Sequence, residues 1–230
     1  MQYPTVNKID TLEAALGQRI GKEEARDWIR EQSKPYRELM SYYRCALMEV
    51  ETKFRVLSEE LSIDNEVNPI EEIKSRLKSP ESIVEKAARR GINLTVEDIE
   101  KFMTDIAGVR VICSYESDVY MLADALLRQS DVGLVEKKDY IANPKPNGYR
   151  SLHLIIAIPI FLHDRTKIMK VEVQLRTLSM NVWATLEHKL AYKKDATPHD
   201  TEAHENLLRC ADLSAELDRL MSETHQLVNR

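Results

Sequence analysis

The 230-residue chain has few of the residues that characterise several common protein classes, with six glycines, eight prolines and three cysteines. The glycines are too widely spaced to form the GxGxxG or GxxxxGK loops that hold nucleotide phosphates in many proteins. Cys45, Cys113 and Cys210 lie far apart without CxxC spacing, which argues against a disulfide framework and favours core cysteines in a reducing compartment. No apolar run approaches the roughly 20 residues of a membrane-spanning helix, and no secretory signal pattern is present. We therefore expect a cytoplasmic protein without membrane contact.

Charged residues are abundant but unevenly distributed. They make up 31% of the chain, with a net charge of −5 and a pI near 5.8. From Lys137 to Lys194, eleven Lys or Arg face four Asp or Glu, a balance of +7, whereas Ala196 to Arg230 has a balance of −4. A basic block within an acidic protein favours local binding of an anionic ligand over general nucleic-acid binding. A basic face balanced by a neighbouring acidic helix is the alternative.

Hydrophobic periodicity predicts an α+β fold, in which a mixed sheet of about five strands is surrounded by helices. Strands are expected at 70–78, 109–115, 132–141, 152–160 and 170–176. Helices are expected within the first 65 residues and at 79–91, 95–105, 116–129, 177–194 and from about 198 onward. We divide the chain accordingly into an N-terminal helical arm (1–66), a central domain (67–195) and a C-terminal helix (196–230).

Two of these helices carry long apolar stripes. From Tyr36 to Leu61, apolar residues recur at spacings of three and four, and Pro35 suits the first turn of such a helix. A second stripe runs from Leu207 to Leu220. The two stripes offer more packing surface than one small sheet can cover, which predicts a homo-oligomer unless the helices cover each other within one chain.

Two carboxylates could carry chemistry. Glu172 shares one face of its strand with Gln174 and Arg176, while the opposite face is apolar. Asp105 precedes another strand in the sequence TDIAGVRV, whose small residues allow close approach of a ligand. If the two strands are neighbours, Asp105 and Glu172 could share Mg²⁺, which prefers a few carboxylates plus substrate phosphates. A solvated sheet face and an ordinary turn residue are the alternatives.

The loop KPNGYRSLH is the most specific feature of the sequence. An exposed Tyr149 beside Gly148 offers a stacking face. Polar and basic residues flank it, namely Lys145, Asn147, Arg150 and His153. The combination fits a nucleobase with its phosphates, whereas a hairpin turn with a packed tyrosine would explain only the Asn-Gly pair.

A third group of residues is mostly cationic. A strand and the following helix are expected to bring together Arg76, Lys78, Ser82, Lys86, Arg89 and Arg90. Such a cluster suits a polyphosphate. Surface pairing with the interleaved glutamates is the rival explanation.

Five stretches, taken together and in order, resemble the synthetase domain of RelA/SpoT-type (p)ppGpp synthetases. They are SRLKSPESIVEK, DIAGVRVIC, KDYIANPKPNGYRSLH, VEVQLRT and MNVWATLEHKLAYK. The resemblance runs from about Asn68 to Lys194, and the chain resembles a small alarmone synthetase. It implies a nucleotidyltransferase-like sheet and a homotetramer. It also implies Mg²⁺-dependent transfer of the β,γ-pyrophosphate of ATP to the 3′-hydroxyl of GDP or GTP, giving AMP and ppGpp or pppGpp in stringent-response signalling.

The resemblance also implies a role for each matched residue. Asp105 and Glu172 match the catalytic and metal-binding carboxylates, with Glu172 holding metal or activating the 3′-hydroxyl. Arg76 and Arg110 match the arginines that sandwich adenine. The implied ATP-binding residues are Arg76, Lys78, Ser82, Lys86, Arg89 and Arg110. The implied GDP- or GTP-binding residues are Lys138, Lys145, Asn147, Tyr149, which stacks on guanine, His153, Gln174 and Asn181.

Two other classes of function compete with this one. A binding module could be a catalytically dead alarmone sensor or an RNA-binding protein, but Asp105 and Glu172 favour an enzyme and the acidic pI disfavours RNA. A nucleotidyltransferase would release free pyrophosphate instead of AMP. Reaction products therefore distinguish all three.

Overall fold

The computed structural model describes residues 22–64, 68–191 and 200–228. Its helices are α2 (Lys22–Asp64), α3 (Pro80–Arg90), α4 (Val96–Phe102), α5 (Glu116–Leu127), α6 (Leu178–Ala191) and α7 (Asp200–Val228). Its strands are β1 (Ile70–Leu77), β2 (Ala107–Cys113), β3 (Gly133–Asp139), β4 (Leu152–Phe161) and β5 (Thr166–Thr177). The predicted α+β fold with a mixed five-stranded sheet is confirmed.

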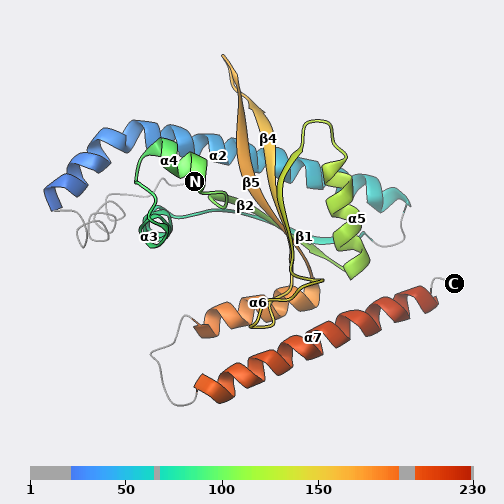
Figure 1. Cartoon of the computed structure of the whole chain (residues 1–230). Helices are drawn as coiled ribbons and strands as arrows, with labels where there is room; N and C mark the ends of the chain where they lie inside the picture. Colours follow the sequence, from blue (N-terminus) through green and yellow to red (C-terminus); the bar gives the residue numbers. More distant parts are fainter. Residues whose placement is uncertain (1–21, 65–67, 192–199, 229–230) are drawn as a thin grey trace.

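The strands lie in the order β1-β2-β5-β4-β3. Only β2 and β5 run parallel, and the other neighbouring pairs are antiparallel. The β4–β5 hairpin projects past α2, as Figure 1 shows. This order puts β5, which carries Glu172, at the centre of the sheet and next to β2.

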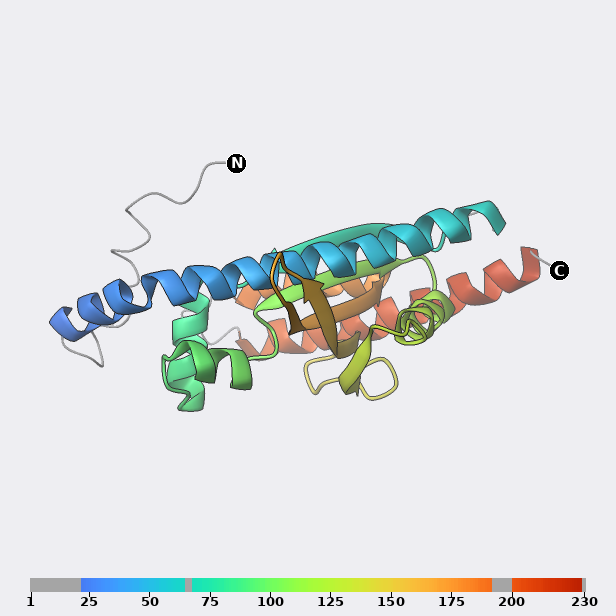
Figure 2. The same cartoon turned by 90° about the horizontal axis from the view of Figure 1, so that it is seen from above.

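Helix α2 crosses one face of the sheet along the length of the molecule (Figures 1 and 2). Its stripe is buried in the same core as the inward-facing residues of the strands, with Leu39, Tyr43 and Phe54 almost fully covered. The expectation that this stripe is left over for another copy of the chain is therefore wrong. The predicted helix start at Pro35 is also wrong, because α2 begins at Lys22 and Pro35 lies inside it. The helix runs through Pro35 although proline lacks a backbone N–H, and Pro35 itself is exposed.

The predicted ends of α3 are confirmed. The Ser79 hydroxyl accepts a hydrogen bond from the Ser82 backbone N–H, and Pro80 follows as the first helical residue. Gly91 ends the helix with φ +66°, a conformation that favours glycine. Helix α4 begins in the same way, with Thr95 as its cap. These caps fix the orientation of α3, which carries Lys86 beside the sheet.

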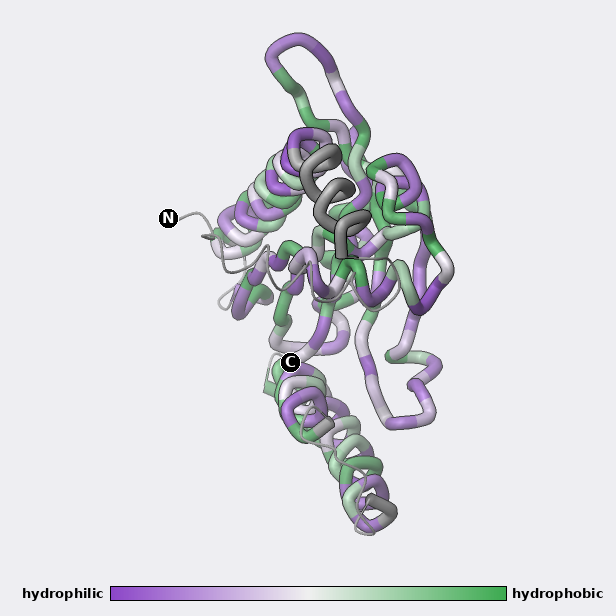
Figure 3. The backbone as a smooth tube through the Cα atoms, turned by 90° about the vertical axis from the view of Figure 1, so that its left-hand side faces the viewer, coloured by the Kyte–Doolittle hydropathy of each residue, from purple (hydrophilic) through white to green (hydrophobic). Residues whose placement is uncertain are grey.

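Helices α6 and α7 lie beyond the carboxyl end of β5 (Figure 1). They are joined by hydrogen bonds from Trp183 Nε1 to the Leu207 carbonyl and from Ser179 Oγ to the Ser214 carbonyl. The overlapping C-terminal helices at the bottom of Figure 3 carry a mixture of hydrophobic and hydrophilic residues. Cys210 on this helix is exposed, so the prediction of core cysteines is wrong for that residue. In the parts of the chain that the structure describes, no helix could cross a membrane.

Candidate active site

The sheet face that α2 leaves uncovered carries polar side chains in two adjacent rows. Strand register aligns Arg76 with Gly108 and Gly108 with Glu172. The next row contains Lys74, Arg110, Gln174, His153 and Lys138, from β1 to β3. Residues from all five strands therefore meet on one face, because each lies on the same side of its pleated strand.

A cavity of about 260 Å³ opens on this face. It is lined by Lys74, Ser75, Arg76, Asp105, Gly108, Val109, Arg110, Glu172 and Gln174. Five of these were expected site residues, from both the ATP-binding and the acceptor groups. The expectation that Asp105 and Glu172 meet across neighbouring strands agrees with this arrangement.

Asp105 is held by two lysines. Lys78 Nζ lies 2.9 Å and Lys86 Nζ 2.6 Å from its Oδ2. Burial alone would raise the pKa of Asp105, but the hydrogen bonds and charges of Lys86 and Lys78 outweigh it and hold that pKa below its ordinary value. Burial in turn lowers the pKa of Lys86, against the opposing effect of Asp105. The cluster pairs one carboxylate with two cations, so it carries an excess of positive charge for an anionic ligand.

Glu172 is held by neutral groups and an imidazole. Its Oε1 lies 3.3 Å from His153 Nδ1, and its Oε2 accepts a hydrogen bond of 2.9 Å from Gln174 Nε2. Burial raises the pKa of this carboxyl, but the hydrogen bonds from His153 and Gln174 bring it below its ordinary value. Glu172 is therefore an oriented, ionised carboxylate that can accept a proton or bind a cation.

The donor set fits a divalent cation that substrate phosphates also coordinate. Asp105 Oδ1 is buried and has no hydrogen-bond partner, so its lone pairs are unsatisfied by the protein. Within the described residues, no group of three or more His, Cys, Asp or Glu could hold a metal on its own. Two carboxylates with phosphates suit Mg²⁺, which is commonly bound by one or two carboxylates and by the substrate.

Tyr149 is half-buried, not exposed as expected. Its ring packs with Trp183, Ala184 and Ala211 from α6 and α7. Lys145 Nζ lies 4.9 Å from the centre of the same ring. The prediction of an exposed Tyr149 considered only the KPNGYRSLH segment, whereas the later helices α6 and α7 pack against one side of the tyrosine ring. A supported aromatic ring with a cation nearby remains suited to stacking on a base.

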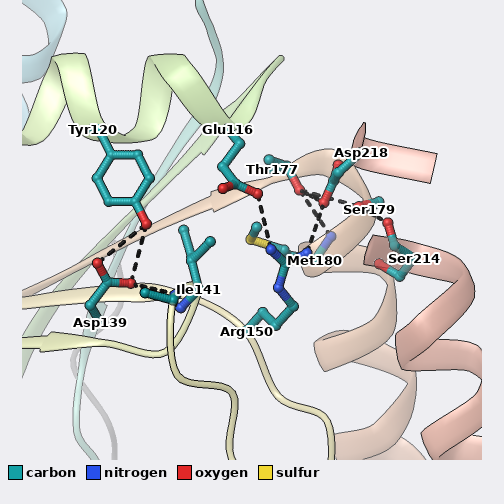
Figure 4. Close-up of polar contacts among 11 residues, drawn as sticks. Glu116, Tyr120, Asp139, Ile141, Arg150, Thr177, Ser179, Met180, Ser214 and Asp218 are labelled. Carbon is teal, nitrogen blue, oxygen red and sulfur yellow. Dashed lines mark hydrogen bonds and ion pairs between the residues drawn. The ribbon is translucent and has the colours of Figure 1, made fainter. Parts of the chain in front are cut away.

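The 143–150 loop is anchored at both ends, as Figure 4 shows. Before the loop, Asp139 accepts hydrogen bonds from the Tyr120 hydroxyl and from the backbone N–H groups of Ile141 and Ala142. At the other end of the loop, Arg150 donates a hydrogen bond to Glu116 of α5 at 3.0 Å. These contacts fix a turn-rich segment with few backbone bonds of its own.

The tip of this loop fits closely against α7. Gly148 has φ +87°, and a Cβ built there would lie 2.5 Å from the Ala211 Cβ. Asn147 Oδ1 accepts a hydrogen bond from the Tyr149 N–H at 3.2 Å, and its amide reaches Glu187 of α6 at 3.5 Å. Glycine is therefore required at position 148 both by the backbone conformation and by the contact.

The remaining expected site residues lie around this centre. Ser82 is in the first turn of α3. Asn181 of α6 is half-buried, with an Oδ1 that has no hydrogen-bond partner. Lys138 is exposed on β3 and pairs with Glu136 at 3.0 Å. Arg89 is exposed in the last turn of α3 and does not line the cavity.

Sequence reasoning missed two residues that support the site. Arg176 was placed on the polar strand face but given no role, and its Nη2 donates to the Tyr149 hydroxyl at 2.6 Å. Trp183 was seen only as part of a motif, although its side chain contacts Tyr149. Strand alternation indicated the face of Arg176, but no local pattern reveals which loop it reaches.

Comparison with known proteins shows what the chain as a whole is similar to. The family model described as "Region found in RelA / SpoT proteins" matches residues 75–197. GTP pyrophosphokinase YwaC of Bacillus subtilis is 49% identical over 151 residues, which cover 66% of this chain and 72% of that protein. GTP pyrophosphokinase YjbM of the same organism is 36% identical over 191 residues, covering 83% and 88%. The crystal structure of small alarmone synthetase 1 from Bacillus subtilis bound to its product pppGpp superposes with a TM-score of 0.77 at 35% identity, covering 86% of this chain and all of that one.

Proposed function

The chain belongs to the RelA/SpoT family, and we propose that it is a GTP pyrophosphokinase that makes ppGpp or pppGpp and AMP from ATP and GDP or GTP. One observation carries this proposal. Asp105 and Glu172 line one cavity with Arg76 and Arg110, and Glu172 is linked through His153 to the loop of Tyr149. A site for a polyphosphate donor therefore adjoins a site for an aromatic acceptor.

On the donor side, Arg76 and Arg110 come from neighbouring strands and both line the cavity, which supports the proposal that they flank adenine. Lys78 and Lys86, now paired with Asp105, lie where they can exchange that carboxylate for phosphate oxygens. Pyrophosphoryl transfer depends chiefly on positioning and on neutralising phosphate charge, which these cations supply.

On the acceptor side, the Tyr149 ring stacks on guanine, and Lys145 and Asn147 contact the same nucleotide. Glu172 accepts the proton of the 3′-hydroxyl, whose oxygen then bonds to the β-phosphorus of ATP. The bond between that phosphorus and the oxygen bridging to the α-phosphorus breaks, and AMP leaves. A Mg²⁺ held by Asp105 and Glu172 would neutralise phosphate charge when bound.

Resolving the nucleotides after incubation with ATP, Mg²⁺ and GDP or GTP tests the proposal. We expect AMP together with a guanosine tetraphosphate or pentaphosphate in equal amounts. Free pyrophosphate would instead identify a nucleotidyltransferase. Nucleotide binding without any product would identify a binding module.

We further propose that the enzyme is a homo-oligomer, with the tetramer implied by its resemblance to small alarmone synthetases as the expected form. Support comes from the large apolar side chains of α6 and α7 that are exposed in the described chain. They are Leu178, Val182, Leu186, Leu190, Leu213, Leu217, Leu220, Met221, Leu227 and Val228. Burial of such side chains is typical of helix–helix interfaces. Light scattering at micromolar concentration tests the proposal, and a monomeric mass would refute it.

A further inference from the structure

Arg176 is a buried cation with neutral partners. Only 4% of its surface is exposed, and no carboxylate lies within ion-pair distance of it among the described residues. Its Nη2 donates to the Tyr149 hydroxyl at 2.6 Å and to Gln174 Oε1 at 3.0 Å, and its Nε lies 3.4 Å from Ser151 Oγ. Burying a guanidinium without a counter-ion is costly, so the hydrogen bonds that Arg176 donates must offset that cost.

Two hydrogen-bond chains lead from Arg176 to Glu172. In the first, the Tyr149 hydroxyl lies 2.7 Å from His153 Nε2, and His153 Nδ1 lies 3.3 Å from Glu172 Oε1. In the second, Gln174 accepts from Arg176 and donates through Nε2 to Glu172 Oε2 at 2.9 Å. A closed ring of five side chains results, which consists of Arg176, Tyr149, His153, Glu172 and Gln174. Both carboxylate oxygens of Glu172 belong to this ring.

The chemistry at its two ends gives the ring a direction. A guanidinium can only donate hydrogen bonds, and an ionised carboxylate can only accept them. The Tyr149 oxygen therefore accepts from Arg176, which leaves its O–H to donate to His153 Nε2. A neutral His153 must then carry its proton on Nδ1 and donate it to Glu172. Glu172 thus sets the tautomer of His153, and Arg176 orients the Tyr149 hydroxyl toward His153 Nε2.

We propose that Arg176 is a positioning residue for the acceptor side of the reaction, which holds Tyr149 and Glu172 in a fixed relative orientation. This inference rests on the proposed function. It means that the base-stacking ring and the carboxylate facing the attacking hydroxyl share one anchor, so that binding of the base also aligns the hydroxyl. Tyr149 then acts through its hydroxyl as well as through its ring.

Kinetics of Tyr149→Phe and Arg176→Met test the proposal. Tyr149→Phe keeps the ring but breaks the first chain, and Arg176→Met removes the common donor at similar length. For both, kcat should fall about ten-fold or more, whereas the KM for ATP should stay within about two-fold, as expected for loss of a positioning contact. Tyr42→Phe is the matched control, because it removes a tyrosine hydroxyl that accepts from Arg165, outside both the ring and the loop of Tyr149.

The tautomer of His153 supplies a readout that does not depend on turnover. Nitrogen-15 NMR of the wild-type protein, at a pH where imidazole is neutral, should show His153 protonated on Nδ1, with His153→Gln identifying the signal. Tyr149→Phe and Arg176→Met should both move the His153 Nε2 resonance, because the hydrogen bond with the Tyr149 hydroxyl is lost or misdirected, whereas Nδ1 should stay protonated beside Glu172. Tyr42→Phe should leave both resonances unchanged.

Unchanged kcat and an unchanged His153 Nε2 resonance in Tyr149→Phe would overturn the proposal, because Tyr149 would then act through its ring alone. If Arg176→Met does not fold, Tyr149→Phe decides, together with Arg176→Lys, which should keep the wild-type Nε2 resonance by retaining a donor. Failure of the proposed function is a separate result. The wild type would then make neither AMP nor pppGpp, while the NMR signals would still report whether the ring exists.

Discussion

The donor and acceptor sides of the cavity are held together by different forces. On the donor side, Asp105 is bound by two lysine ammonium groups, at 2.9 and 2.6 Å. On the acceptor side, Glu172 is bound through His153 and Gln174 in directed hydrogen bonds. Ion pairs made by flexible lysines can be exchanged for phosphate oxygens, whereas a directed network works only if it stays intact. The donor side is thus built to rearrange around its ligand and the acceptor side to stay fixed.

Removing one carboxylate at a time should have the largest effect on kcat. These variants test whether the donor side and the acceptor side are both needed for the reaction. Asp105→Asn and Glu172→Gln each delete a charge with little loss of volume, so kcat should fall by at least about a hundred-fold. AMP formation measures the loss, and circular dichroism confirms that the fold remains. Activity within a few-fold of wild type for either variant would contradict the assignment of that residue.

Tyr149→Ala should break the acceptor side alone. Loss of aromatic stacking is worth roughly 1–3 kcal/mol per base, which corresponds to about ten- to a hundred-fold weaker binding of guanine nucleotide. Arg110→Met is the reciprocal variant and should weaken only the ATP analogue. Separate titrations of GTP and a non-hydrolysable ATP analogue provide the measurement. If Tyr149→Ala weakened the binding of both nucleotides equally, the role of the 143–150 loop would be purely structural. If it weakened the binding of the ATP analogue alone, the donor and acceptor sites would be reversed.

Gly148→Ala tests whether contact with α7 keeps the acceptor side fixed. The added Cβ would meet Ala211 in a backbone conformation that already disfavours alanine, so the loop must shift, and GTP affinity should drop about ten-fold. Gly91→Ala is the matched control, since φ is also positive there but nothing lies within 4 Å of the new Cβ. Both variants should lose about 1 kcal/mol of stability from backbone strain, and only Gly148→Ala should lose GTP affinity. Equal GTP affinity in the two variants would show that the contact with α7 is dispensable.

The smallest expected effect is on stability in acid. The pKa of Asp105 is lower in the folded protein, so its ionised form stabilises the fold above its unfolded pKa of about 3.9 and that contribution disappears as pH falls through the folded value. Urea unfolding between neutral pH and pH 3 should therefore show the wild type losing on the order of 1 kcal/mol more stability than Asp105→Asn. Parallel pH profiles for the two proteins would mean that the lysines contribute no net stabilisation.

Much of the fold could be predicted because its signals are local. Alternation on 170–176 gave a strand with Glu172 on its polar face, and the Ser79-Pro80 pair with Gly91 gave the limits of α3. The failures concern features that no local pattern reveals. Pro35 has the local preference of a helix start, yet α2 runs through it, and Tyr149 was expected to be exposed but packs against α6 and α7. The division of the chain at residues 66 and 195 stays a prediction.

The candidate site was likewise predictable in part. The sequence by itself determined its residue types and their alternation on the strands, and hence that Asp105, Glu172 and the arginines could form an anion site. Only the tertiary structure decided that Tyr149 rests on α6 and α7 and is tied to Arg176. The physical reason is distance along the chain, because strand pleating repeats every two residues and can be read locally, whereas side-chain contacts between remote segments depend on how the whole core packs.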